Sequence, residues 1–321
     1  MTSHTKKIYI LIILAILSFI INLSFGSNLA SIYNIFSSDT SFDIIFKIRL
    51  PRALMAILAG GTFALCGAVF QSLFRNPIAS PFTLGTAGGA SFGVTLFISF
   101  FSIQSFAGMA LTSLFAFLGS LLSIAIVYFA SSRKRNFNPN SMILTGVVIN
   151  FFFSGLILFL QYLTDQANAV RITRWTMGGL DIVGMNSIYF AAVIFSAGFI
   201  LIYNFRDDLN LLFIGEEISV SRGVNINRSR KHLFIISSLM ISSIVSFTGP
   251  IGFIGIIAPH IASQYFGRNY RILLPSSLVV GSIILLICDV ISRTILWPVE
   301  IPVGIITALI GAVFFIKIIS K

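Results

Sequence analysis

The chain is dominated by apolar runs of membrane-spanning length, separated by short segments that carry charges, proline or glycine. Crossing the hydrocarbon core of a bilayer as a helix takes roughly 20 mostly apolar residues. Charged residues make up only 10% of this sequence and hydrophobic residues 56%, whereas soluble domains carry about 25% charged residues. The pattern therefore predicts an all-α, polytopic membrane protein with about ten transmembrane helices.

The apolar runs define the expected spans within a single transmembrane domain, residues 1–321. They are 8–25, 53–74, 81–101, 107–131, 141–163, 187–204, 232–248, 253–266, 272–292 and 302–319. The run 253–266 is short for a full crossing. The first run resembles a signal peptide, but no small-residue cleavage site follows it, so we expect a retained helix.

Lysine and arginine are distributed unequally between the two sides of these spans. If the N-terminus is cytoplasmic, fifteen bases lie inside and six outside. The inner set is Lys6, Lys7, Arg75, Arg133, Lys134, Arg135, Arg206, Arg222, Arg228, Arg230, Lys231, Arg268, Arg271, Lys317 and Lys321. The outer set is Lys47, Arg49, Arg52, Arg171, Arg174 and Arg293. The positive-inside rule then places both termini in the cytoplasm. The same rule explains the net charge of +11 without a nucleic-acid partner.

Side chains that could carry chemistry are scarce. The phosphate-loop pattern G-x-x-x-x-G-K-[ST] is absent, which excludes nucleotide hydrolysis by that means. Neither the cysteines nor the histidines show zinc-ligand spacing, so we expect no metal site and no cofactor. His260 could bind a metal or gate a path, but a packing role is favoured. Trp175 and Trp297 are expected in the aromatic belt at the membrane surface.

Asp289 is the exceptional acid within the predicted spans, and Arg293 follows four residues later on the same helical face. One interpretation is a proton or ion site, because proton relays in membranes are built from such groups. The favoured interpretation is a local ion pair that lowers the cost of burying both charges.

Two segments interrupt the apolar pattern with proline and glycine, one at 76–81 and one at 249–252. Paired broken segments are typical of transporters with inverted repeats. The alternative, which the sequence supports equally, is that the two segments are unrelated loops.

The longest polar segment is about 206–231, on the predicted cytoplasmic side. Within it, acids follow Gly215 and a base precedes Gly223, which suits the dipole and the C-terminal turn of a short helix. Such a helix could lie against a soluble partner. A solvated loop is the alternative.

Several spaced motifs, in order along the chain, resemble those of the FecCD-type permeases, the iron-siderophore, haem and cobalamin permeases of ABC importers. The resemblance runs from about residue 45 to the end of the chain. The motifs are Arg49-Leu50-Pro51-Arg52, Gly60-Gly61, Gly67, Gln71, the run 74–81, Gly85, Gly88-Gly89-Ala90, the run 175–179, the run 249–255, Pro259-His260, Asp289 with Arg293, and the run 300–304.

The resemblance implies a type II ABC importer permease fold in the cell inner membrane. It implies a second permease subunit, either a second copy or a paralogue, together with two cytoplasmic ATPase subunits and an external substrate-binding protein. The permease of this family has no catalytic residues, because ATP hydrolysis takes place on the separate ATPase.

The resemblance also implies roles for individual residues. Docking of the binding protein is expected at Arg49, Arg52 and Arg293, where complementary charge would fix the register. ATPase coupling is expected at Gly215, Glu216, Glu217, Arg222 and Gly223. The cytoplasmic gate is expected at Asn76, Ile78, Pro139 and Asn140. Two positions depart from the family pattern: Arg222 replaces a usual leucine, and Ser80 stands where many relatives have an acid.

The leading hypothesis is therefore a permease that imports an iron chelate, with a ferric siderophore favoured, haem as the close alternative, and cobalamin or molybdate less favoured. Arg171 and Arg174 could contact carboxylates of the substrate. An ion-coupled secondary transporter is the second hypothesis, but it lacks membrane acids. A membrane-embedded enzyme would need a cluster of His, Asp or Glu, which the sequence does not show.

Overall fold

The computed structural model describes residues 3–25, 44–101, 106–132, 139–181 and 184–319, and the regular elements of this part of the chain are all helices, without strands. The first half contains α1 (Ser3–Ser24), the π-helix η2 (Ile44–Arg49), α3 (Leu50–Phe74), the 3-10 helix η3 (Pro81–Leu84), α4 (Thr86–Phe100), α5 (Phe106–Ser132) and α6 (Pro139–Leu163). The second half contains α7 (Gln166–Thr176), α8 (Asn186–Asn204), α9 (Arg206–Ile214), α10 (Glu216–Ser221), α11 (Ile226–Thr248), α12 (Ile254–Phe266), α13 (Tyr270–Thr294) and α14 (Val303–Ile319).

All ten predicted spans coincide with helices. Seven helices in the described part are long and apolar enough to cross a membrane, and α4 and α14 are shorter apolar helices. The predicted short run at 253–266 forms α12, which has 13 residues. The chain is thus an all-α integral membrane protein, as predicted. Four bases counted in the charge distribution, Arg133, Lys134, Arg135 and Lys321, lie outside the described residues.

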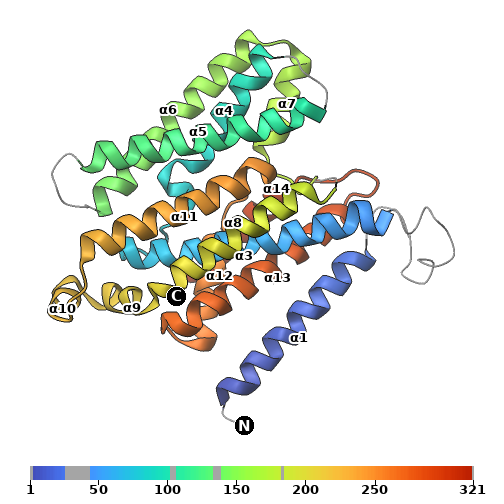
Figure 1. Cartoon of the computed structure of the whole chain (residues 1–321). Coiled ribbons are helices and arrows are strands. Elements are labelled where there is room, and N and C mark those ends of the chain that lie inside the picture. Colours follow the sequence, from blue (N-terminus) through green and yellow to red (C-terminus); the bar gives the residue numbers. More distant parts are fainter. Residues whose placement is uncertain (1–2, 26–43, 102–105, 133–138, 182–183, 320–321) are drawn as a thin grey trace.

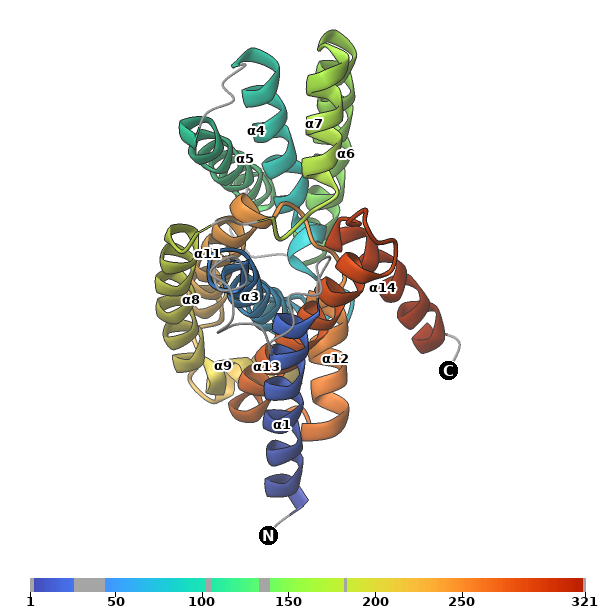
Figure 2. The ribbon, with the colours of Figure 1, turned by 90° about the vertical axis from the view of Figure 1, so that its right-hand side faces the viewer.

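The long helices form two groups (Figure 2): α4 to α7 make one group, and α3, α8, α11, α12 and α13 make the other. The helix α3 runs through the second group and packs against α8, α11, α12 and α13. Most of this helix is buried inside the protein, because its side chains are apolar on nearly every face. The helix α3 is therefore the central element around which the other helices of this group are arranged.

Glycine at the helix contacts brings backbones close together. A methyl group on Gly60 of α3 would lie 2.4 Å from the carbonyl oxygen of Gly281 on α13, and one on Gly67 would lie 1.9 Å from that of Gly255 on α12. In lipid the hydrophobic effect does not drive helices together, so close packing of small residues supplies much of the association.

The short polar helices and the connecting segments lie at two opposite ends of the bundle (Figure 1). The first, called here the α10 end, carries α9, α10, the turn 75–80 and the loop 267–269. The second, the α7 end, carries α7 and the segments 177–181, 184–185 and 295–302. The helix α7 was not predicted, because it is short and polar and therefore gives no span signal.

The polar segment 206–231 contains two short helices, α9 and α10, and then the first residues of α11, so the helical interpretation is confirmed for its central part. The helix α10 spans Glu216–Ser221 and ends at Gly223, whose φ is +82°. The amide of Gly223 donates to the carbonyl of Val220, and that of Val224 donates to the carbonyl of Ser219, at 2.9 and 3.0 Å. This pair of bonds is a Schellman motif, which explains the requirement for glycine at this position.

Candidate functional site

A buried cluster of charges lies at the α7 end, centred on Asp289 of α13. This side chain is fully buried. One carboxylate oxygen accepts from Arg52 Nε at 2.7 Å, and the other accepts from Asn22 Nδ2 at 2.9 Å and lies 2.9 Å from Arg293 Nη2. The predicted ion pair between Asp289 and Arg293 is confirmed, and Arg52 and Asn22 extend it to α3 and α1.

Two arginines of this region bind the last carbonyl groups of α1. Arg49 Nη1 donates to the carbonyls of Leu23 and Ser24 at 2.9 and 3.1 Å. Arg293 Nη2 donates to the carbonyl of Asn22 at 3.0 Å. Carbonyls at a helix C-terminus have no partner within the helix, so these guanidinium groups fasten α1 to the rest of the bundle.

The three arginines predicted to dock the binding protein thus lie at one end of the bundle, but they are not surface groups. Arg49, Arg52 and Arg293 are 4%, 8% and 3% exposed. Their guanidinium groups bond within the chain, so a docking partner would contact them only if some of these bonds opened. The docking role stays a prediction.

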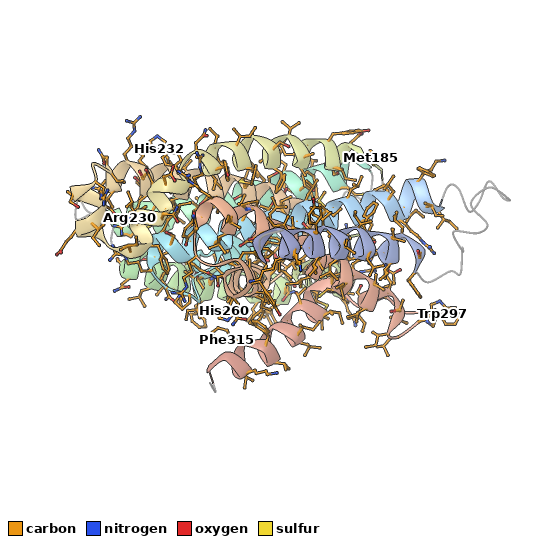
Figure 3. The ribbon with its side chains drawn as sticks, turned by 90° about the horizontal axis from the view of Figure 1, so that it is seen from below. Met185, Arg230, His232, His260, Trp297 and Phe315 are labelled. Carbon is orange, nitrogen blue, oxygen red and sulfur yellow. The ribbon has the colours of Figure 1, made fainter. Side chains whose placement is uncertain are left out.

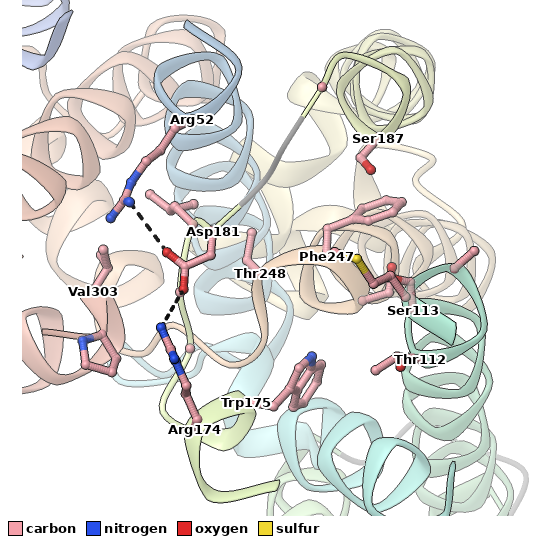
Figure 4. Close-up of a pocket in the computed structure, with 18 of the residues that line it drawn as sticks. Arg52, Thr112, Ser113, Arg174, Trp175, Asp181, Ser187, Phe247, Thr248 and Val303 are labelled. Carbon is pink, nitrogen blue, oxygen red and sulfur yellow. Dashed lines mark hydrogen bonds and ion pairs between the residues drawn. The ribbon is translucent and has the colours of Figure 1, made fainter. Parts of the chain in front are cut away.

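A cavity of about 1110 Å³ opens between the two helix groups at the α7 end. Arg174 and Trp175 of α7 lie on one wall, and Phe247 of α11 lies on another (Figure 4). The helix α5 contributes Thr112 and Ser113. The cavity therefore combines aromatic and polar walls, as small-molecule sites commonly do.

Charged side chains on the cavity wall are largely paired with one another. Arg52 Nη1 lies 2.8 Å from Glu300 Oε2 and 3.4 Å from Asp181 Oδ1, and Arg174 Nη2 lies 3.8 Å from Asp181 Oδ2. Arg171, in contrast, donates to the amide oxygen of Asn168 at 3.1 Å. Both acids on the wall, Asp181 and Glu300, are paired with arginine side chains. The charge of Arg171 therefore gives the wall a net positive charge.

The helix α7, which carries Arg171 and Arg174, begins at an N-cap. The Asp165 carboxylate accepts from the backbone amide of Asn168 at 3.0 Å, and this bond lowers the pKa of Asp165. Aspartate at the N-cap is a common start signal, so Asp165 was the available sequence clue to α7. Asp181 and Glu300 were not assigned a role from sequence.

The α10 end carries the residues predicted to couple to an ATPase. Glu216 Oε1 accepts from Arg230 Nη2 at 2.8 Å, and Arg75 Nη2 lies 3.9 Å from the same oxygen. The bond from Arg230 lowers the pKa of Glu216. Glu217 is exposed on α10 and Arg222 is exposed at its end. The five predicted coupling residues therefore lie on one small helical unit, held to α11 through Glu216.

The predicted gate residues lie at this same end. Asn76 Oδ1 accepts from the amide of Ile78 at 3.0 Å, which closes the turn after α3, and Ile78 is exposed. The helix α6 begins at Pro139, and Asn140 is exposed beside it. The gating role of the four residues stays a prediction.

Comparison with known proteins assigns the family. The model of the FecCD transport family matches residues 12–321. The hemin transport system permease protein HmuU of Yersinia pestis is 33% identical over 91% of this chain and 87% of its own length. The iron(3+)-hydroxamate import system permease protein FhuG of Bacillus subtilis is 30% identical over 96% and 95% of the two chains.

A solved inward-facing structure of an ABC transporter assigned to the metal-chelate type shares the fold. It superposes with a TM-score of 0.88 at 29% identity, over 99% of both chains. This chain belongs to the FecCD transport family. It is a membrane-embedded permease of the ABC-transporter kind, and the permeases of this family are not themselves enzymes.

We predict that Asp289→Asn destabilises the protein strongly. The substitution keeps the shape of the side chain but leaves the buried Arg52 and Arg293 without their shared carboxylate. Breaking a buried ion pair on one side costs about 3–5 kcal/mol. The measurement is the thermal unfolding midpoint of the purified chain in detergent, which should fall.

Asp181→Asn is the matched control. The Asp181 side chain is 62% exposed, and its ion pairs are longer than those of Asp289. Pairs of this kind contribute about 1 kcal/mol or less. If both variants unfolded at the same temperature, the structural role of Asp289 would be contradicted.

Proposed function

We propose that this chain is the permease subunit of an ATP-driven importer that moves an iron chelate, specifically a ferric siderophore, into the cytoplasm. The observation that carries the proposal is the similarity along nearly the whole chain to permeases named for hydroxamate-bound iron and for hemin. Haem is the second candidate substrate. Cobalamin is less favoured.

The distribution of charge supports transport by an ATP-driven path in preference to ion coupling. Ion-coupled carriers use acids in the membrane that gain and lose protons. Asp289, the acid that the sequence pointed to, lies between Arg52 and Arg293. Both arginines engage its carboxylate, at 2.7 and 2.9 Å, and this arrangement suits a structural ion pair better than a proton relay.

The proposed arrangement places the α10 end in the cytoplasm, with both termini, and the α7 end outside. The bases that flank the described spans support this orientation through the positive-inside rule. In this arrangement the segment with Glu216 and Glu217 faces a groove on the cytoplasmic ATPase, of which the complex has two subunits. The cavity faces the external binding protein. A second permease subunit, identical or paralogous, completes the inner-membrane complex.

In this arrangement Arg171 and Arg174 contact the substrate in the cavity. The positive charge of Arg171 is not offset by an acid among the described residues, and Trp175 offers an apolar surface beside it. The carboxylate or hydroxamate oxygens of a chelate would meet the guanidinium groups, since charge-assisted hydrogen bonds are the strong ones.

The substrate is tested with the complex of permease, ATPase and cognate binding protein in lipid vesicles. A panel of ferric trihydroxamate, ferric citrate, hemin and cobalamin is added with the binding protein outside, and ATP hydrolysis and iron uptake are measured. We expect a ferric siderophore to stimulate both. Stimulation by hemin alone would select the second candidate, and stimulation by cobalamin alone would contradict an iron substrate.

Coupling is tested by co-purification of the ATPase with single variants of the permease. Glu217→Ala should weaken association at least about tenfold, equivalent to ~1.4 kcal/mol, because this exposed carboxylate has no ion pair among the described residues. The thermal midpoint should not change. Glu216→Gln is the comparison, because it also breaks the bond to Arg230. Unchanged co-purification of both variants would reject the coupling role.

The docking role needs variants that preserve the fold. Arg49→Gln and Arg293→Gln remove charge without reversing it, and the thermal midpoint of each reports the cost of losing the bonds to α1. If these arginines dock the binding protein, the affinity of each variant for the binding protein should fall by more than its loss of folded protein can explain. The loss of affinity should be larger at low salt. Unchanged affinity at low salt would reject the role.

A further inference from the structure

A second hollow lies at the α10 end, away from the large cavity. It is a groove of about 610 Å³ between the junction of α8 and α9 and the start of α11. Its lining includes Phe205, Asp208, Arg222, Asn225, Arg228 and His232. The helices α8 and α11 are both candidate membrane spans, ending at Asn204 and beginning at Ile226. The groove therefore lies at the membrane boundary.

The groove has an excess of positive charge. Arg222 and Arg228 are exposed, and neither forms an ion pair within the described part of the chain. The acid on the lining, Asp208, accepts a hydrogen bond from Ser229. Other arginines at this end do pair with acids: Arg230 with Glu216, and Arg271 with Asp207. The two groove arginines are thus available to an external anion.

One face of α11 continues from the groove into the membrane. Arg228, His232, Ile235 and Leu239 are spaced at i, i+4, i+7 and i+11, which places them on a single face of the helix. Ile235 and Leu239 are each 42% exposed. This face is basic at the membrane boundary and apolar below it. Figure 3 shows His232 at the same end of the bundle as Arg230, far from Met185 and Trp297.

His232 is held in place on this face. Its Nδ1 donates to the carbonyl of Arg228 at 2.7 Å, and its ring stacks on Phe205 with centroids 6.0 Å apart. His232 therefore shapes one side of the groove as a fixed ring. The groove presents two guanidinium groups to an anion at the boundary of the membrane.

We propose that this groove binds the headgroup of an anionic phospholipid, with the acyl chains lying along Ile235 and Leu239. Arginine binds phosphate oxygens through paired N–H donors, and basic side chains at the membrane surface attract anionic lipids. The exposed apolar side chains that follow the groove within the membrane span favour a lipid over an acidic segment of a soluble partner. A lipid has acyl chains that can contact them, and a soluble partner does not. The proposal does not depend on which substrate is carried.

Native mass spectrometry of the full chain tests the proposal. The purified protein is equilibrated with equal amounts of phosphatidylglycerol and phosphatidylcholine, and the retained lipid is measured. Phosphatidylglycerol should be retained preferentially. The double variant Arg222→Gln with Arg228→Gln should lower its retention about tenfold or more. The charge-preserving double variant with lysine should keep most of it.

Arg268→Gln is the matched control, because Arg268 is an exposed arginine at the same end that lies over the ring of Phe213, outside the groove lining. It should retain phosphatidylglycerol as the unmodified chain does. Helix content and unfolding temperature of all variants establish that each is folded.

Three results would overturn the proposal. The first is equal retention of the two lipids by the unmodified chain. The second is unchanged retention by the double glutamine variant; if that variant also lost ATPase co-purification, the groove would be assigned to the ATPase, because Arg222 belongs to the proposed coupling segment. The third is displacement of the lipid by inorganic phosphate at equal concentration, which would mean a simple anion site.

Discussion

The carboxylate of Asp289 is the interaction on which the rest of the α7 end depends. A charge in the low-dielectric interior of a membrane protein is costly unless it is paired and hydrogen-bonded. Here the pairing recruits Arg52 from α3, Arg293 from α13 and Asn22 from α1. One buried charge therefore ties together three helices that are separated along the chain.

The same cluster extends from the interior to the surface of the cavity. Arg52 contacts buried Asp289 through Nε and the cavity acids Glu300 and Asp181 through Nη1. Arg174 then reaches Asp181 from α7 in the other helix group. A continuous line of ion pairs thus links the core of one group to the wall of the other.

At the opposite end the polar contacts have a different character. Glu216 and Asp207 are bonded to Arg230 and Arg271 close to the surface, and Arg222 and Arg228 remain exposed. The bundle therefore has an apolar middle with few ionisable groups and two polar ends with separate contacts. This division suits a protein that supplies a path through the membrane and leaves energy conversion to a partner.

Much of the fold was predictable from sequence, because a span is a local property. An apolar run long enough to cross a bilayer has few alternatives to a helix, so all ten predicted segments coincide with helices. The bond between Asp289 and Arg293 was predictable for the same reason, since residues four apart share a helical face. The helix α10 was recognisable from its acids and its terminal Gly223.

The remaining features depend on tertiary structure. Arg52 and Asp289 are 237 positions apart, and no local pattern pairs them. The burial of Arg49 follows from its bonds to the end of α1, which a charge count cannot reveal. The helix α7 was missed because a polar helix of 11 residues gives no membrane signal. For the candidate sites, the sequence indicated the two polar ends of the bundle. It did not indicate which side chains at these ends form bonds within the chain.

In the proposed function this chain provides a path through the membrane, and ATP drives transport along it. The most direct measurement is uptake of an iron chelate into sealed vesicles that hold the permease, its ATPase and internal ATP, with the binding protein outside and an ionophore that collapses the proton gradient. If ATP drives transport, uptake continues with the ionophore and stops when ATP is removed. Uptake that stops with the ionophore and continues without ATP would contradict ATP-driven transport.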